Sequence, residues 1–142
     1  MNEILAKQLA IDFCTDVNSI LSKENVFTEY KQLVGRRIFK EGECYFKAAS
    51  VNGKIVASGR KDIIQWAREK FKTENGAWFM DMGCLHNLED GLLKFHCRIG
   101  QAHPFYIATK KSDVDTKDYD IKIFIGDELE QFRGDKRFEE AF

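Results

Sequence analysis

The chain has 142 residues, 44% of them hydrophobic, and its 22 basic residues nearly balance its 23 acidic residues. This length and composition predict one domain over residues 1–142 with a single apolar core, and they exclude intrinsic disorder. The near-neutral charge excludes a global field for nucleic acid or anionic membranes, and the absence of a long apolar run or a signal-peptide pattern predicts a cytoplasmic protein without a membrane segment.

Two amphipathic helices are predicted at the start of the chain. Apolar residues recur at steps of three and four over residues 4–22, which predicts the first helix. A similar spacing over residues 25–40 predicts a second helix, although Gly35 weakens its second half.

A β-hairpin and a third helix are predicted next. The alternating stretches "ECYFKAASV" and "KIVAS" flank Asn52-Gly53, a pair that suits a type I′ turn. A helix is expected over residues 58–72, with Ser58 as its possible N-cap. Its apolar face comprises Ile63, Ile64, Ala67 and Phe71.

Residues 77 to about 126 are predicted to form antiparallel strands. Asp90-Gly91 is interpreted as the turn of a second hairpin, and Pro104 is expected at a sheet edge or a strand start. The tail after residue 126 is expected to be a short helix or a loop, docked by Leu129, Phe132 and Phe138.

The turn at Asp90-Gly91 sets a register for the sulfur- and histidine-rich stretch "GCLHNLEDGLLKFHC". It pairs Cys84 with Cys97 and His86 with Phe95 on one mostly apolar face. The other face receives Lys94, His96 and Arg98. Because only three possible ligands share a face, no metal site is expected, and the two cysteines are interpreted as a packed thiol pair, with a disulfide as the alternative.

The order of elements predicts an α+β layer architecture. The segment "FKAASVNGKIVASGRKDIIQWAREKF" resembles the nuclear-transport-factor-2-like superfamily, which includes SnoaL-like cyclases and ketosteroid isomerases. The resemblance implies three helices of the N-terminal half packed on a strongly curved, mainly antiparallel sheet. This sheet would form a cone with an apolar pocket, and its outer face would pair two copies as a homodimer.

The candidate site residues follow from this arrangement. His86 is the candidate acid–base group, because imidazole titrates near neutral pH, and Asp16 is its candidate partner carboxylate. The residues expected to line a pocket for a mostly apolar small molecule are Tyr45, Trp78, Met82 and Phe95. Lys47 falls roughly where ketosteroid isomerases carry their aspartate base, which argues against that particular chemistry.

Two functions stay open at this point. The first is a SnoaL-like enzyme that moves a proton in an isomerisation, dehydration or cyclisation, without a cofactor. The second is a non-catalytic ligand-binding or protein-interaction module whose cone is filled by its own side chains. The cationic outer row and its neighbouring aromatic residues could hold single-stranded nucleic acid, but the net charge does not favour such a partner.

Overall fold

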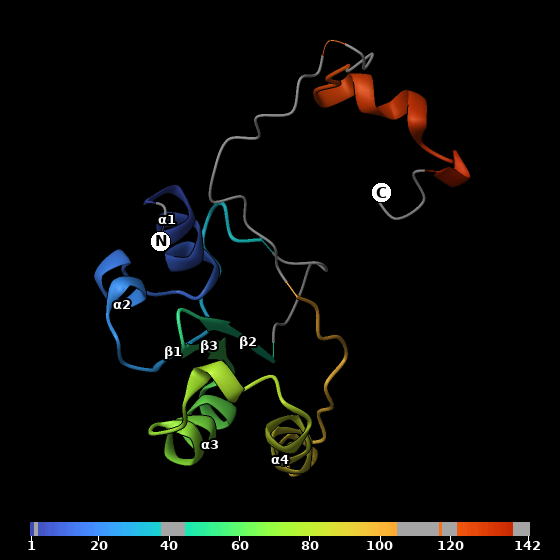
Figure 1. Cartoon of the computed structure of the whole chain (residues 1–142). Helices are drawn as coiled ribbons and strands as arrows, with labels where there is room; N and C mark the ends of the chain where they lie inside the picture. The colour runs from blue at the N-terminus through green and yellow to red at the C-terminus, as the bar shows by residue number, and fades with distance from the viewer. Residues whose placement is uncertain (2, 38–44, 105–116, 118–121, 138–142) are drawn as a thin grey trace. The chain divides into compact units, whose positions relative to one another are not determined.

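The computed structural model describes residue 1 and residues 3–37, 45–104, 117 and 122–137 (Figure 1). The chain divides into two compact units, residues 1–102 and residues 103–142. In the second unit the structure describes a 3₁₀ helix, η2 (Gly126–Phe132), and the ring of Phe132 meets that of Phe124 edge-on at 4.8 Å. No helix among the described residues has the length and apolarity needed to cross a bilayer.

The first unit is built on a mixed sheet with the strand order β1-β3-β2. Its strands are β1 (Val26–Glu29), β2 (Phe46–Val51) and β3 (Lys54–Gly59). Strand β3 is central: β1 runs parallel to it and β2 runs antiparallel. Helices and a sheet in one unit confirm the predicted α+β class.

The predicted hairpin around Asn52-Gly53 is confirmed. Asn52 has φ 51° and Gly53 has φ 76°, the two left-handed conformations that a type I′ turn requires. The ladder then pairs Val51 with Lys54 and continues to Phe46 opposite Gly59. Because side chains alternate along a strand, this register turns Ile55 and Ala57 to one face and Val56 to the other.

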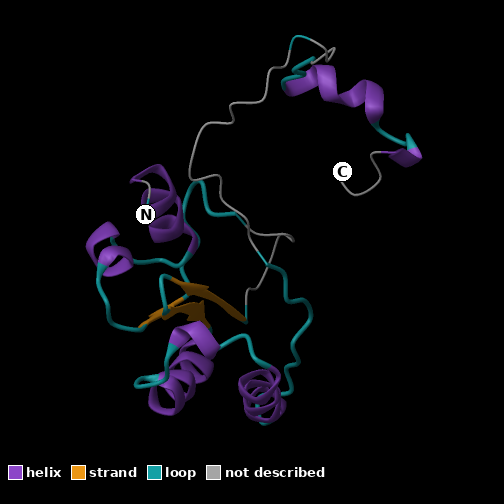
Figure 2. Ribbon diagram, viewed as in Figure 1, coloured by secondary structure: helices purple, strands orange, loops and turns teal. Residues whose placement is uncertain are grey.

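Each face of the sheet is covered by helices (Figures 1 and 2). Helices α1 (Glu3–Asp12) and α2 (Val17–Leu21) cover the face of Val56, while α3 (Lys61–Phe71) and α4 (Met82–Leu93) cover the face of Ile55 and Ala57. The core residues behind Val56 are Ala6, Leu9, Ala10, Phe13 and Ile20. The core residues on the other face include Phe27, Ile63, Ile64, Ala67, Phe71, Phe79, Leu88 and Leu92.

Helix α3 confirms the third predicted helix and its apolar face. All four residues expected on that face are buried. The predicted N-cap was wrong, because Ser58 belongs to β3 and Arg60 occupies the N-cap position without a side-chain hydrogen bond.

The predicted first helix over residues 4–22 is split in two. Cys14 has φ 52°, a left-handed conformation that ends the first segment. Asp16 then caps α2, accepting a hydrogen bond of 2.9 Å from the backbone N–H of Ser19. A short polar side chain that accepts a hydrogen bond from a backbone N–H three residues later favours a helix start over a helix interior. Asp16 therefore interrupts the continuous apolar pattern.

The helix predicted over residues 25–40 was wrong within the described residues. Residues 26–29 form β1, and residues 30–37 form a loop in which Gly35 has φ 79°. Val26 pairs with Val56 in the parallel ladder, and Phe27 enters the core against α3. Pairing with a distant strand therefore overrides the helical spacing of the apolar residues.

The hairpin predicted around Asp90-Gly91 was also wrong, because both residues lie inside α4. A 3₁₀ turn, η1 (Gly76–Trp78), precedes this helix, so residues 77–97 contain no strand. Leu88 and Leu92, four residues apart, face the core. Of the later predicted strands, residues 122–125 are described without strand structure, and residues 105–116 and 118–121 lie outside the described residues, as does Phe138. The short helix predicted for the tail corresponds to η2.

Gly91 lets α4 lie directly against α3. A Cβ atom at Gly91 would overlap the indole atoms Cζ2 and Cη2 of Trp66, whereas a Cβ at Gly83 of the same helix would meet nothing within 4 Å. We expect Gly91→Ala to lower the free energy of unfolding by about 1–3 kcal/mol through overpacking. Gly83→Ala is the matched control and should leave it unchanged or raise it by up to about 1 kcal/mol.

Urea denaturation of both variants tests this contact. Trp66→Leu makes room for the added methyl group, so the cost of Gly91→Ala should shrink in that background. An equal cost in the two backgrounds would contradict packing of Gly91 against Trp66.

Candidate functional site

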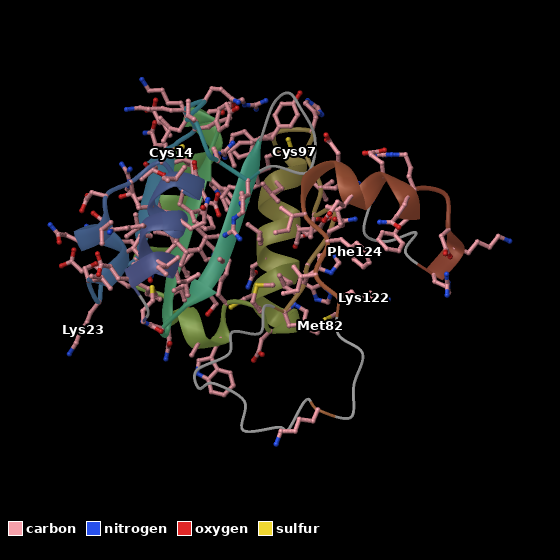
Figure 3. All side chains as sticks on the ribbon, turned by 90° about the horizontal axis from the view of Figure 1, so that it is seen from above. Cys14, Lys23, Met82, Cys97, Lys122 and Phe124 are labelled. Atoms are coloured by element: carbon pink, nitrogen blue, oxygen red, sulfur yellow. The ribbon has the colours of Figure 1, made fainter. Side chains whose placement is uncertain are left out.

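The structure places His86 on an exposed part of α4. Met82 lies in the first turn of the same helix and Cys97 just beyond its other end (Figure 3). Among the described residues, none forms a hydrogen bond or an ion pair with His86. Within the described residues, the imidazole is thus exposed and has no hydrogen-bonded carboxylate or hydroxyl beside it.

Asp16 has a structural task at the start of α2. Its carboxylate accepts hydrogen bonds from the Ser19 hydroxyl at 2.7 Å and from the Ser19 N–H at 2.9 Å, and these bonds lower the pKa of Asp16. Helix α2 lies on the opposite face of the sheet from α4. The structure thus keeps Asp16 and His86 on different sides of the sheet.

The four predicted pocket residues are dispersed. Tyr45 precedes β2 and is 46% exposed, with the Arg60 guanidinium 5.6 Å from its ring centroid. Phe95 is half-buried at the edge of the core, with its ring 5.9 Å from that of Trp66. Trp78 and Met82 are 63% and 67% exposed. Only these last two share a short segment, the connection from η1 to α4.

The cysteines do not form the predicted facing pair. Cys84 lies in the first turn of α4, whereas Cys97 follows the helix and donates a hydrogen bond of 3.4 Å to the carbonyl of Phe95. Cys14, Cys84 and Cys97 are free thiols, and Cys44 lies outside the described residues. Within the described ranges, no three side chains of the His, Cys, Asp and Glu types gather as metal ligands.

A polar cluster built around two buried residues, Asp12 and Arg36, lies instead at the C-terminal end of α1. It consists of Gln8, Asp12, Arg36, Arg37 and Lys47, and we call it the Asp12 cluster. Asp12 is 1% exposed. Its Oδ1 accepts hydrogen bonds from Gln8 Nε2 at 3.0 Å and from the Arg37 N–H at 2.8 Å, while its Oδ2 accepts from Arg37 Nε at 2.8 Å.

These hydrogen bonds decide the ionisation of Asp12. Burial alone raises the pKa of this carboxyl group. The bonds from Arg37 and Gln8, together with the charge of Lys47, outweigh burial and lower the pKa below its usual value. Asp12 is therefore a fixed negative charge that anchors the loop of residues 30–37 to α1.

Arg36 is the second buried charge of the cluster. It is 8% exposed, and its Nε donates a hydrogen bond of 3.1 Å to the backbone carbonyl of Asp12 at the end of α1. The Tyr30 ring stacks on the guanidinium, with 4.1 Å between the ring centroid and Cζ. The Nη1 and Nη2 atoms are buried, and no described residue accepts a hydrogen bond from them.

Ser58 is a further buried polar group on this face of the sheet. It is fully buried, and its Oγ forms no hydrogen bond with any described residue. Ser58 lies between Thr28 of β1 and Lys47 of β2 in the strand register. The Lys47 Nζ lies 5.2 Å from the ring centroid of Phe13, next to Asp12.

The Asp12 cluster could not be predicted from the sequence. A helix was expected over residues 25–40, and it left Arg36 and Arg37 without a defined neighbour. In the structure they lie on a loop whose position depends on the pairing of β1 with β3. The adjacent arginines near Gly35 were the available signal, but their spacing does not indicate which carboxylate they contact.

Comparisons with protein-family models, with curated proteins and with solved structures found no match to this chain.

Removal of the Asp12 charge should destabilise the first unit. We expect Asp12→Asn to lower the free energy of unfolding at pH 7 by about 2–3 kcal/mol, because charged hydrogen bonds to Arg37 are lost in a buried position. Asp16→Asn is the exposed control, since asparagine also caps a helix. In chemical denaturation, its loss in the free energy of unfolding should be clearly smaller than that of Asp12→Asn.

The same substitution should change the acid response. Because the pKa of Asp12 is lowered in the folded protein, its contribution is complete above the unfolded value of 3.8 and is lost as the pH falls through the lower folded value. Between pH 6 and about pH 2.5, the melting temperature should therefore fall less steeply in Asp12→Asn than in the unchanged protein. The same dependence of melting temperature on pH in both proteins would contradict the lowered pKa of Asp12.

Ser58→Ala should stabilise the protein. A buried hydroxyl without a partner costs free energy that a methyl group of nearly the same size does not. We expect a gain of up to about 1 kcal/mol in urea denaturation. A loss of similar size would show that the hydroxyl is satisfied, for instance by a buried water molecule.

Proposed function

We propose that the chain is a protein-interaction module that binds a short apolar segment of a partner protein. The observation that carries this proposal is a run of exposed apolar side chains at the start of α4. Trp78, Met80 and Met82, which we call the Trp78 corner, are 63%, 40% and 67% exposed. Tryptophan and methionine are enriched where proteins bind one another, and methionine adapts to varied partner surfaces.

The backbone of the corner is held in place, which supports binding without a large ordering cost. Phe79, between two exposed residues, is 1% exposed, and its ring meets that of Phe71 edge-on at 5.5 Å. Asn75 accepts a hydrogen bond of 2.9 Å from the N–H of Ala77. Gly76 lies so close to the backbone of Lys54 that a Cβ there would overlap it.

The size of the Trp78 corner supports a short segment as its partner. A tryptophan side chain buries on the order of 150–250 Å². The exposed parts of the three side chains therefore provide roughly 400 Å², about half of what one partner contributes to a standard interface. This area fits one face of an amphipathic helix or strand in a transient complex, and it is small for a stable dimer formed by this corner alone.

The proton-transfer activity receives less support from the geometry. A carboxylate that orients His86 would favour this chemistry, and no described residue supplies one by a hydrogen bond. Membership of the nuclear-transport-factor-2-like superfamily, a cone with a pocket for an apolar small molecule, homodimers through the outer sheet face and a cytoplasmic location stay predictions. The two described faces of the sheet carry helices, which limits the area open to such a dimer.

Fluorescence titration tests the interaction. Trp66→Phe leaves Trp78 as the single tryptophan, so the fluorescence emission of this protein comes from the Trp78 corner. Addition of a synthetic amphipathic peptide with Leu and Lys at helical spacing should shift its emission to shorter wavelength in a saturable way. The double substitution Met80→Ser with Met82→Ser should weaken binding about 10-fold, because apolar burial is lost.

Val34→Ser is the control, since Val34 is fully exposed away from the corner. It should leave peptide binding unchanged. Equal binding by the Met80→Ser, Met82→Ser protein would contradict the proposal. Saturable binding of a small apolar dye at Trp78 without peptide binding would favour the small-molecule prediction instead.

A further inference from the structure

We propose that Arg36 forms a binding site for the oxyanion of a small molecule, a phosphate or a carboxylate, at the C-terminal end of α1. The site is separate from the Trp78 corner and from His86. Three observations support it: the unused hydrogen-bond donors of Arg36, the absence of a described carboxylate partner for Arg36, and a second unpartnered polar group on the same face of the sheet.

The free donors of Arg36 are arranged to bind two oxygens of one anion. Its Nε is bound to the Asp12 carbonyl and one face is stacked with Tyr30, so the guanidinium is fixed in position. Its Nη1 and Nη2 remain buried and without an acceptor among the described residues. These two nitrogens form the fork that binds phosphate or carboxylate oxygens in pairs.

Arg36 has no carboxylate partner among the described residues. Arg37 uses its Nε and Nη2 on Oδ2 of Asp12, so this carboxylate is matched by Arg37. No described carboxylate lies within ion-pair distance of Arg36. Lys47 lies next to the pair of Arg37 and Asp12, and its Nζ donates a hydrogen bond of 3.2 Å to the Arg37 carbonyl. An unpaired buried cation is costly, and an anion would offset that cost.

A second buried polar group lies on the same face of the sheet. The Ser58 Oγ is fully buried and unpartnered, and Ser58 is the direct strand neighbour of Lys47. Two such groups on one face are unusual, because buried polar atoms in folded proteins nearly always have partners. An occupied site would provide the missing acceptor for Arg36.

The competing explanation uses the chain itself. Glu41 and Glu43 follow Arg36 in sequence and lie outside the described residues. If one of them neutralised Arg36, the protein would need no external anion. The experiment therefore includes the double variant Glu41→Gln with Glu43→Gln.

Thermal unfolding and calorimetric titration of the full chain test the proposal. Sodium phosphate and sodium acetate are compared with sodium chloride at equal ionic strength and pH 7. At about ten times the dissociation constant, the preferred anion should raise the melting temperature by several degrees. A larger rise in melting temperature in phosphate would indicate a phosphate ligand, and a larger rise in acetate would indicate a carboxylate ligand.

Arg36→Lys keeps the charge but removes the fork, so it should weaken binding at least about 10-fold. Lys23→Gln removes an exposed charge elsewhere and should bind as the unchanged protein does. Since Arg36→Lys can also affect folding, NMR of the arginine Nε–H signals in the unchanged protein gives a second measurement. The Arg36 signal should shift saturably with the anion.

Three results would overturn the proposal. The first is an equal melting temperature in phosphate, acetate and chloride at the same ionic strength. The second is equal anion affinity in the Arg36→Lys protein, or NMR shifts confined to other arginines. The third is saturable binding only in the Glu41→Gln, Glu43→Gln protein, which would identify the chain's own carboxylate as the partner of Arg36.

Discussion

Burial of β3 on both faces is the constraint on which the first unit depends. All residues of this strand are buried, although two of them, Lys54 and Ser58, are polar. Lys54 is accommodated because its Nζ donates hydrogen bonds to the Ser19 carbonyl and the Ser22 hydroxyl at the end of α2, while burial lowers its pKa. The strand thereby fixes the position of α1 and α2 on one side and of α3 and α4 on the other.

Local rules predict the middle of the chain well. The Asn52-Gly53 turn and the apolar face of α3 depend on neighbouring residues, and both were predicted from the sequence. Only Arg60 connects the end of β3 to the start of α3, so the two elements have little freedom in their relative position. Prediction succeeds here because each element is specified by residues within the element itself.

Distant contacts determine the elements that were not predicted. Strand β1 exists because it pairs with β3, and α4 depends on the approach of Gly91 to Trp66. An alternating pattern around an Asp-Gly pair favours a hairpin, but Leu88 and Leu92 suit a helix once α3 offers an apolar surface. For the candidate sites, Trp78 and Met82 were named from the sequence as pocket residues and not as exposed ones, whereas the contacts of Asp12 and Arg36 require the fold.

The parallel pairing of β1 with β3 has a consequence for the order of folding. The β2–β3 hairpin closes through a two-residue turn, whereas Val26 meets Val56 only after the chain has looped back past all of β2. Closing a long loop costs more entropy than closing a short one, so the hairpin with α3 is the expected early structure. Strand β1 then joins late, and the loop that carries Arg36 becomes ordered only in that final step.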